Sequence, residues 1–262
     1  GAFLGAPLLP LSHAEDPLGF GEAAFAFDLR LPPHGLERVV LAVPLHPESP
    51  PPPSGLSRTE ASAWADEVLD GAIGAWTARL SRIPIELPPI AAPWAETLRA
   101  SLAWILVNRE GPRIQPGPRC YRRSWIRDGA ITGTALAEMG FAEELRAFLR
   151  WYAPFQDEDG RVPCAVDRHG IDRAVEHDSH GELVFGVVEL FRLTGDEAFL
   201  RELWPHVQRA TGAIEALLAT RKGPAFAGDA RHGLLPESIS HEGYSSQPVH
   251  SFWDDFFALR AL

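Results

Sequence analysis

The sequence has few cysteines and almost no lysine or methionine. Its 262 residues include two cysteines, Cys120 and Cys164, and one methionine. Two cysteines can form at most one bridge, so a disulfide framework is excluded. Lys222 is the only lysine among 24 basic residues, so arginine carries nearly all of the positive charge. The sequence leaves open whether the two cysteines pair and in which compartment the protein resides.

Long apolar runs and an excess of positive charge are also missing. No run approaches the ~20 apolar residues that span a bilayer, and residues 1–10 carry no basic segment before their apolar stretch, as a signal peptide would. We therefore expect a soluble chain without a membrane span. The formal net charge is −11, which repels phosphate backbones. A nucleic-acid partner is disfavoured, whereas a neutral polar substrate is compatible.

The first part of the chain shows a β pattern. Apolar residues make up 45% of the sequence, an ordinary globular proportion, and the length corresponds to one or two domains. Residues 20–45 alternate apolar and polar positions on either side of a Pro-Pro-His-Gly turn, which predicts a β-hairpin or the edge of a sheet. Proline-rich residues 48–54 predict a stiff linker. Residues 1–55 are therefore expected to be the end of a β region.

The remainder of the chain shows helical periodicity. Residues 59–81 predict one amphipathic helix capped by Ser57 or Thr59, and residues 56–93 then form a linker helix and an extended segment. Beyond it, no strand signal of comparable quality occurs. Short and long connections alternate among the later helices, which predicts stacked hairpins with the long loops, and a functional site, at one end. Six helices are predicted there, over residues 94–109, 128–139, 141–154, 180–194, 196–220 and 250–262.

The first long loop ends in a group of aromatic and charged residues. Trp125 offers an apolar ring on which the CH face of a sugar can stack, and Arg127 and Asp128 can each bind adjacent hydroxyls. This combination is typical of a pyranose subsite. The structural alternative is that Asp128 caps the next helix, Arg127 pairs with it and Trp125 lies in the core.

The second long loop ends in histidines and acidic residues, over residues 176–182. Such side chains can ligate a metal or hydrogen-bond substrate hydroxyls. The i, i+4 histidine pair of a helical zinc site is absent, so we predict no metal and retain Asp178 and His180 as candidate substrate-binding residues. The alternative is that Asp178 or Ser179 caps the following helix, with Glu182 in its first turn.

The third long loop holds the candidate catalytic acids, Glu237 and Glu242. Hydrolysis of an acetal needs a carboxylic acid that protonates the leaving oxygen and a second carboxylate that attacks or activates water. Glu242 and its neighbour Tyr244 suit a tight, partly buried loop that raises the pKa of the acid. Glu237 follows a proline and can face solvent. Glu242 is therefore favoured as the acid, and Tyr244 is a candidate binding residue.

Other chemistries lack their motifs. There is no Gly-x-Ser-x-Gly elbow, no cysteine with a histidine of the usual signature, and no glycine-rich phosphate loop after a strand. Acyl and phosphoryl transfer are therefore disfavoured, and no cofactor is expected.

Taken in order, these segments resemble the six-hairpin (α/α)6 glycosidases, which include glucoamylases, trehalases and glycogen-debranching glucosidases. The resemblance covers about residues 94–262. It implies a mostly α protein, with an incomplete (α/α)6 toroid of about three hairpins preceded by the C-terminal part of a β-sandwich (residues 1–55) and a linker helix. The motifs that carry it are Ser124–Ala130, His177–Glu182, Thr194–Asp196, Leu203–Pro205, Gly233–Pro236 and Phe252–Phe257.

The resemblance also implies roles for particular residues. Trp125, Arg127 and Asp128 match a Trp-x-Arg-Asp motif that holds the sugar at the cleaved end, and the general acid falls in the interval that contains the two candidate acids. Trp253 and Asp254 are similar to a trehalase motif that usually lies earlier in the barrel, which makes both candidate binding residues. For Asp254 the alternative is capping of the helix that it begins.

The catalytic base of the superfamily comes from the second half of the barrel. The chain stops at Leu262 inside an apolar helix, so we expect a truncated chain that lacks the base and is inactive by itself. The predicted function is hydrolysis of an α-glucosidic or related linkage in an oligo- or polysaccharide, with inversion implied by the resemblance. Because a fold does not determine a reaction, the alternatives are a glycoside phosphorylase, a polysaccharide lyase or a non-catalytic carbohydrate-binding protein.

Overall fold

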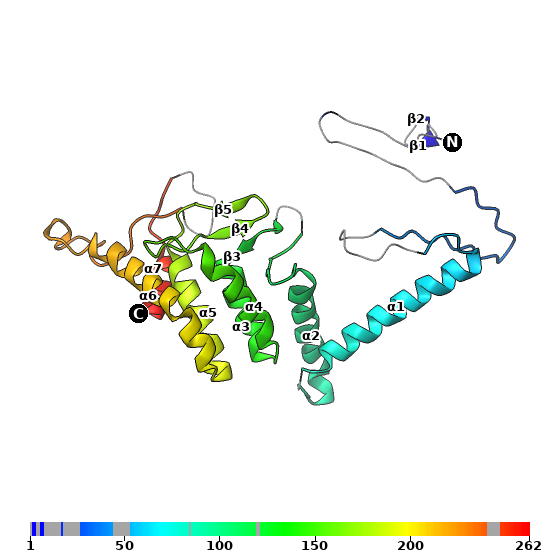
Figure 1. Cartoon of the computed structure of the whole chain (residues 1–262), viewed down its shortest axis with the longest axis horizontal. Helices are drawn as coiled ribbons and strands as arrows, with labels where there is room; N and C mark the ends of the chain where they lie inside the picture. Colours follow the sequence, from blue (N-terminus) through cyan, green and yellow to red (C-terminus); the bar gives the residue numbers. More distant parts are fainter. Residues whose placement is uncertain are drawn as a thin grey trace. The chain divides into compact units, whose positions relative to one another are not determined.

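The computed structural model is mostly helical with a small three-stranded sheet (Figure 1). It describes residues 2–3, 6–7, 17, 27–43, 53–83, 85–118, 121–239 and 247–262. The chain divides into two compact units, residues 1–75 and 76–262. The α-helices among the described residues are α1 (Arg58–Leu80), α2 (Ala92–Val107), α3 (Ile126–Glu138), α4 (Ala142–Tyr152), α5 (Asp178–Thr194), α6 (Glu197–Ala219) and α7 (Phe252–Ala261).

All seven predicted helices are confirmed, and every boundary lies within two residues of its prediction. Short 3-10 turns flank several of them, over Pro89–Ala91, Ala153–Phe155 and Pro224–Phe226. None of the helices in the described ranges is long and apolar enough to cross a membrane. The closure of the helices into part of a toroid stays a prediction.

The first unit contains little β structure. Strands β1 (Ala2–Phe3) and β2 (Ala6–Pro7) form a short antiparallel ladder. Residues 27–43 contain a turn but no strand, so the predicted hairpin is not confirmed there; residues 20–26, 44 and 45 lie outside the described residues. A hairpin with no larger apolar surface to cover it is marginally stable in water, and the apolar side chains of residues 27–43 are mostly exposed.

Helix α1 begins with the predicted cap. The Ser57 hydroxyl accepts a hydrogen bond from the Glu60 backbone N–H at 3.3 Å, and the Glu60 carboxylate accepts one from the Ser57 N–H at 2.8 Å. This reciprocal pair satisfies two of the N–H groups that a helix start leaves free. No residue of α1 is fully buried, but the predicted apolar positions Trp76 and Leu80 are partly buried and pack against the core of the second unit.

The core of the second unit lies between α2, α3, α4, α5 and α6. Its largest fully buried side chains are aromatic, Phe141, Phe148, Tyr152 and Phe199. A Cβ atom on Gly129 of α3 would lie 1.9 Å from the Phe148 ring, so glycine allows the close approach of α3 and α4.

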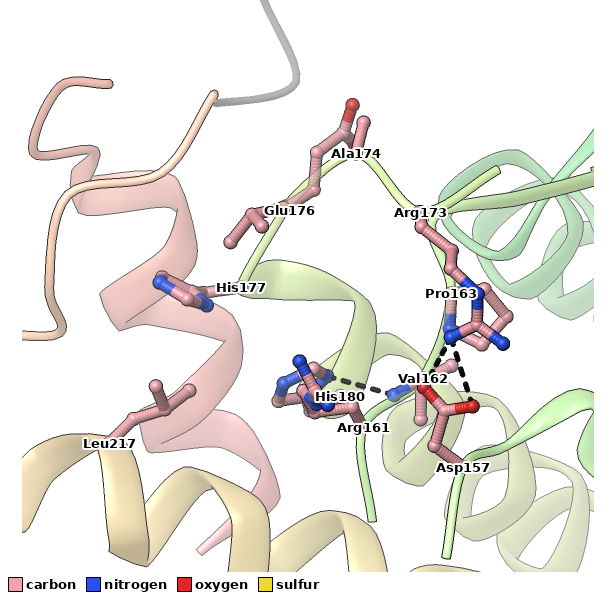
Figure 2. A pocket seen from close by; sticks show the side chains of 11 residues that line it. Asp157, Arg161, Val162, Pro163, Arg173, Ala174, Glu176, His177, His180 and Leu217 are labelled. Atoms are coloured by element: carbon pink, nitrogen blue, oxygen red, sulfur yellow. Dashed lines mark hydrogen bonds and ion pairs between the residues drawn. The ribbon is translucent and has the colours of Figure 1, made fainter. Parts of the chain in front are cut away.

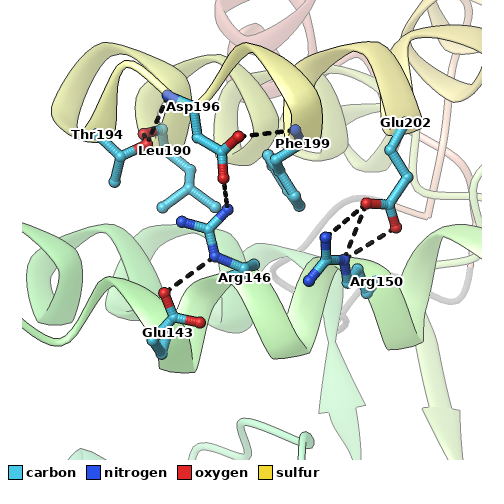
Figure 3. A network of polar contacts seen from close by, with 8 residues as sticks. All are labelled: Glu143, Arg146, Arg150, Leu190, Thr194, Asp196, Phe199 and Glu202. Carbon is cyan, nitrogen blue, oxygen red and sulfur yellow. Dashed lines mark hydrogen bonds and ion pairs between the residues drawn. The ribbon is translucent and has the colours of Figure 1, made fainter.

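The short connection between α5 and α6 is tied to α4 (Figure 3). Gly195 takes a left-handed φ of 68° at the end of α5. Asp196 caps α6, because its carboxylate accepts the Phe199 N–H at 3.0 Å, and it also accepts a hydrogen bond from Arg146. One turn further along α4, Arg150 donates to both oxygens of Glu202 at 2.6–3.0 Å. These ion pairs align α4 with α6 beside the core.

Three very short strands form a sheet that was not predicted from the sequence. They are β3 (Ser124–Trp125), β4 (Ala165–Asp167) and β5 (Gly170–Asp172), antiparallel in the order β3-β4-β5. Strands of two or three residues are too short to show an alternating pattern. The register pairs Trp125 with Ala165 and so joins the first long loop to the second. Cys164 is buried beside β4, and Cys120 lies outside the described residues.

The sheet marks the end of the molecule at which the candidate site is built. Figure 1 shows β3, β4 and β5 at the end of α3 and α5 where these helices begin. Each of α3, α5 and α7 follows a long connection. The prediction that the long loops share one end is confirmed by the side-chain contacts between the first turns of these three helices.

Candidate functional site

Asp178 joins the first turns of three helices. Its Oδ2 atom accepts hydrogen bonds from Arg127 Nη1 of α3 at 3.3 Å and from Trp253 Nε1 of α7 at 2.9 Å. Arg127 Nη1 also donates to Glu176 Oε2 at 3.0 Å. The structure thereby brings together three of the predicted binding residues, Arg127, Asp178 and Trp253, from distant parts of the chain. We call the group the Arg127 cluster, and it comprises Arg127, Glu176, Asp178, Glu182, Trp253 and Asp254.

The capping alternatives for Asp178 and Asp128 were wrong. Helix α5 begins at Asp178, its N-cap is His177, and no side chain caps it. Helix α3 has Trp125 as its N-cap, so Asp128 lies inside its first turn. Arg127 forms its ion pairs with Glu176 and Asp178 of the second long loop. Trp125 is only partly buried. The charged Arg127 guanidinium forms stronger hydrogen bonds to a carboxylate than a neutral backbone N–H does, which explains why Asp178 pairs with Arg127 and does not cap α5.

Asp254 is also not a cap residue. The N-cap of α7 is Ser251, and Asp254 is buried in the first turn, where its Oδ2 atom accepts the Ser238 hydroxyl at 2.6 Å. The neighbouring Asp255 accepts the Leu235 backbone N–H at 2.8 Å. These two bonds hold the third long loop against the start of α7.

The Arg127 cluster contains more carboxyl groups than Arg127 can neutralise. Burial and the nearby Asp178 raise the pKa of Glu176 to about 6, although Arg127 opposes the shift. Burial, together with Asp178, also raises the pKa of Asp254 to about 6. The same two causes raise the pKa of Glu182, which is fully buried on α5, well above its ordinary range. The cluster therefore holds protonated carboxyl groups at mildly acidic pH.

Arg127 stays charged in this environment. Burial opposes the charged form, but Glu182, Asp178 and Glu176 outweigh burial and raise the pKa of the guanidinium. Within the described ranges, several buried oxygens near it have no hydrogen-bond partner. They are Asp178 Oδ1, Ser179 Oγ, Asp254 Oδ1 and both carboxyl oxygens of Glu182.

Trp125 and Asp128 lie at the start of α3 beside Arg127. The Trp125 ring is 6.2 Å from the ring of Tyr121, between centroids, and the Arg123 guanidinium lies 5.1 Å over it. Tyr121 is more than half exposed and Trp125 is partly open, so an aromatic surface faces outward. Burial raises the pKa of Asp128 above its ordinary value.

His180 belongs to a neighbouring cavity of about 220 Å³ (Figure 2). Its Nδ1 atom accepts the Val162 backbone N–H at 3.3 Å, and burial lowers the pKa of the imidazole to about 4. His180 is therefore neutral at physiological pH. Glu176 connects the two places, since it lines the cavity and pairs with Arg127. The other lining residues are Asp157, Arg161, Val162, Pro163, Arg173, Ala174, Val175, His177 and Leu217.

Of the two candidate acids, the structure describes Glu237. Glu237 pairs with Arg221 and with His250, whose Nε2 atom lies 3.1 Å from Glu237 Oε1. Its own backbone N–H and Arg221 hold the pKa of Glu237 below its ordinary value, so it is ionised at neutral pH. Glu242 and Tyr244 lie outside the described residues. The assignment of the acid stays a prediction.

Three residues of the site, Glu176, Glu182 and Ser238, were not among the candidates retained from the sequence. Glu176 and Glu182 flank Asp178 in the sequence, but only the packing of α3 against α5 turns them toward Arg127. Ser238 is brought to Asp254 by a backbone bridge with Val249. The part of the chain that the structure describes contains no group of three or more His, Cys, Asp or Glu side chains that could hold a metal ion.

Comparison with known proteins gives one distant relation. No family model matches the chain. The chain is 27% identical over 129 residues to a protein of Methanocaldococcus jannaschii described as an uncharacterized glycosyl hydrolase. The match covers 47% of this chain and 20% of that protein. A partial, glycosidase-like relation is thus shown, and the particular superfamily stays a prediction.

Proposed function

We propose that the chain forms the sugar-binding part of a glycoside hydrolase that acts on an α-glucosidic or related linkage by acid/base hydrolysis. The observation that carries the proposal is the convergence of Arg127, Asp178 and Trp253 from the first turns of three helices. The distant relative described as a glycosyl hydrolase supports the same class of reaction.

The cluster has the groups that a sugar ring requires. The outward face of Trp125 can stack on the CH face of a pyranose, and Arg127 donates hydrogen bonds to adjacent hydroxyls. Asp178 is fully buried and holds the Arg127 guanidinium in place through their ion pair. Asp128 completes the set at the start of α3. We therefore assign these four residues to one pyranose subsite.

Glu242 is our candidate for the general acid. Glu237 suits this role less well, because its pairs with Arg221 and His250 stabilise the charged form. Glu176 and Asp254, each with a pKa of about 6, are further groups that can carry a proton near neutral pH. The resemblance places the base outside the motifs of residues 94–262, so the first test measures binding rather than turnover.

The test is binding to a glycan array, followed by calorimetry on the strongest binder. Trp125→Ala is expected to weaken binding about fivefold, since stacking on an aromatic face contributes about 1 kcal/mol. Trp204→Ala is the matched control, because Trp204 lies on α6 and is 46% exposed. Binding of no glycan by the folded chain, or equal binding by both variants, would contradict the proposal. Hydrolysis that survives both Glu242→Gln and Glu237→Gln would contradict the assignment of the acid.

A further inference from the structure

A second cavity, of about 770 Å³, lies beside the aromatic surface of Trp125 and Tyr121. Its wall is rich in arginine, which sets it apart from the acidic Arg127 cluster. The residues that decide its charge are Arg113, Arg122, Arg123, Arg168, Glu110 and Asp167. We call this cavity the arginine pocket.

The arginine pocket is positively charged although the whole chain is acidic. Arg122 and Arg113 share one carboxylate, that of Glu110, at 2.5 and 3.5 Å. Arg123 pairs with Asp172 at 2.6 Å and Asp167 at 3.3 Å. Arg168 has no acidic partner within the described ranges. Four guanidinium groups thus face three carboxylates.

Ion pairs orient Arg113, Arg122 and Arg123, and the Arg168 Nε–H donates to His169 Nε2 at 3.0 Å. Backbone hydrogen bonds of 3.1 Å in both directions join Glu110 to Arg113, and Gln115 donates to the Glu110 carboxylate. Arg168 lies in the turn between β4 and β5, where the next backbone N–H, that of His169, donates to Asp167 at 2.7 Å. Preorganised guanidinium groups bind carboxylate, sulfate and phosphate with paired hydrogen bonds.

The pocket adjoins the proposed sugar subsite directly. Arg123 lines the pocket and lies 5.1 Å over the Trp125 ring. When a sugar stacks on Trp125, the next sugar unit of the glycan, or a substituent of the stacked sugar itself, therefore lies within reach of the pocket. The net charge of −11 is compatible with a neutral substrate, but charges farther away than about 8 Å are largely screened at physiological salt. The local guanidinium groups decide which ligand this pocket accepts.

We infer that the substrate is an acidic glycan, whose carboxylate, sulfate or phosphate group occupies the arginine pocket while an adjacent sugar stacks on Trp125. This inference rests on the proposed function and narrows its substrate class. The guanidinium groups gather in one pocket of a chain whose net charge is −11, which favours a single anionic group over a long polyanion such as a nucleic acid.

The test uses the full chain on an array that holds neutral, carboxylated, sulfated and phosphorylated glycans, together with a single-stranded RNA. Wild-type protein is expected to bind acidic glycans, and raising the salt is expected to weaken that binding. The double variant Arg122→Gln/Arg168→Gln is expected to weaken it about tenfold. Arg201→Gln, on the exposed face of α6, is the matched control and is expected to change nothing. Thermal melts of both variants verify that they are folded.

Each result decides the inference. Acidic binders of one chemical class, weakened in the double variant and unchanged in the control, support it and identify the anion. Binding of neutral glycans only would overturn the inference and leave the proposed function intact. Binding of RNA in place of glycans, or equal binding by wild type and the double variant, would also overturn it. Binding of no glycan at all would overturn both the inference and the proposed function.

Discussion

Trp253 donates its indole N–H to Asp178 at 2.9 Å across 75 positions of sequence, and this bond joins the start of α7 to the start of α5. Arg127 donates to the same oxygen from α3. Asp178 is fully buried, so its carboxylate depends on these donors for compensation of its charge. Asp178 therefore belongs to the candidate site and also holds the first turns of α3, α5 and α7 together.

The first prediction concerns the Trp253 donor. Trp253→Phe keeps an aromatic ring but removes the indole N–H from buried Asp178. We expect the free energy of unfolding to fall by about 1–3 kcal/mol, because the hydrogen bond is to a charged group. Urea denaturation measures this change. Trp204→Phe, on an exposed face of α6, is the control, and an equal loss in both variants would show that the Asp178 bond is not the cause.

The second prediction concerns the carboxyl group of Glu176. Its pKa rises from the ordinary value of 4.5 to about 6 on folding, so the folded state binds more protons between these pH values. The contribution of Glu176 to stability is therefore full below pH 4.5 and is lost as the pH rises through 6.

Glu176→Gln removes this titration. Relative to wild type, the variant is expected to gain about 1–2 kcal/mol of stability between pH 4.5 and pH 7. Urea denaturation at several pH values measures the difference. Glu143→Gln, at a carboxyl group that is 80% exposed, is the control. A difference between wild type and Glu176→Gln that does not change with pH would refute the raised pKa.

The third prediction has the opposite sign and concerns His180. Burial lowers its pKa from 6.5 to about 4, so the unfolded state binds more protons between these values. Wild type is expected to lose up to about 3 kcal/mol, relative to His180→Gln, as the pH falls from 6.5 to 4. Glutamine still offers an oxygen to the Val162 N–H. His232→Gln, at an exposed histidine, should show no such trend.

The fourth prediction concerns the approach of α3 to α4. In Gly129→Ala the new methyl group would lie 1.9 Å from the Phe148 ring, and the helices must separate. We expect a loss of about 1–3 kcal/mol from overpacking. Gly212→Ala, inside α6 with open space around it, is expected to gain up to about 1 kcal/mol from helix propensity. Thermal or urea denaturation of both variants checks the contrast, and similar stabilities would contradict it.

The helices were predictable because their cause is local. Apolar residues at helical spacing and breakers such as Gly140 and Gly195 located all seven helices to within two residues. The strands β3, β4 and β5 were not predictable, since two or three residues carry no period. The β3–β4 pairing also joins positions about 40 apart in sequence. The hairpin expected at residues 20–45 failed over residues 27–43 for a related reason: alternation shows which residues can form a strand, but a strand also needs a partner surface.

The candidate site was likewise predictable in part from the sequence, whereas the rest of it depends on the tertiary structure. Arg127 and Asp178 were predicted from the sequence because of their residue chemistry, and Trp253 because of its resemblance to a trehalase motif. Their mutual hydrogen bonds, and the replacement of the expected capping roles by buried ion pairs, depend on how α3, α5 and α7 pack. Glu176 and Glu182 entered the site only through that packing.

The amino-acid sequence by itself determined where the helices lie, where the polar loops fall between them, and that aromatic and charged side chains of the kinds that bind sugars occur at those loops. Propensity, spacing and residue chemistry are local properties. The tertiary structure decided which charges meet. Burial of several carboxyl groups around Arg127 raised the pKa values of Glu176 and Asp254, and the short sheet placed arginines beside Trp125. These effects come from distances and solvent exclusion between segments far apart in the chain.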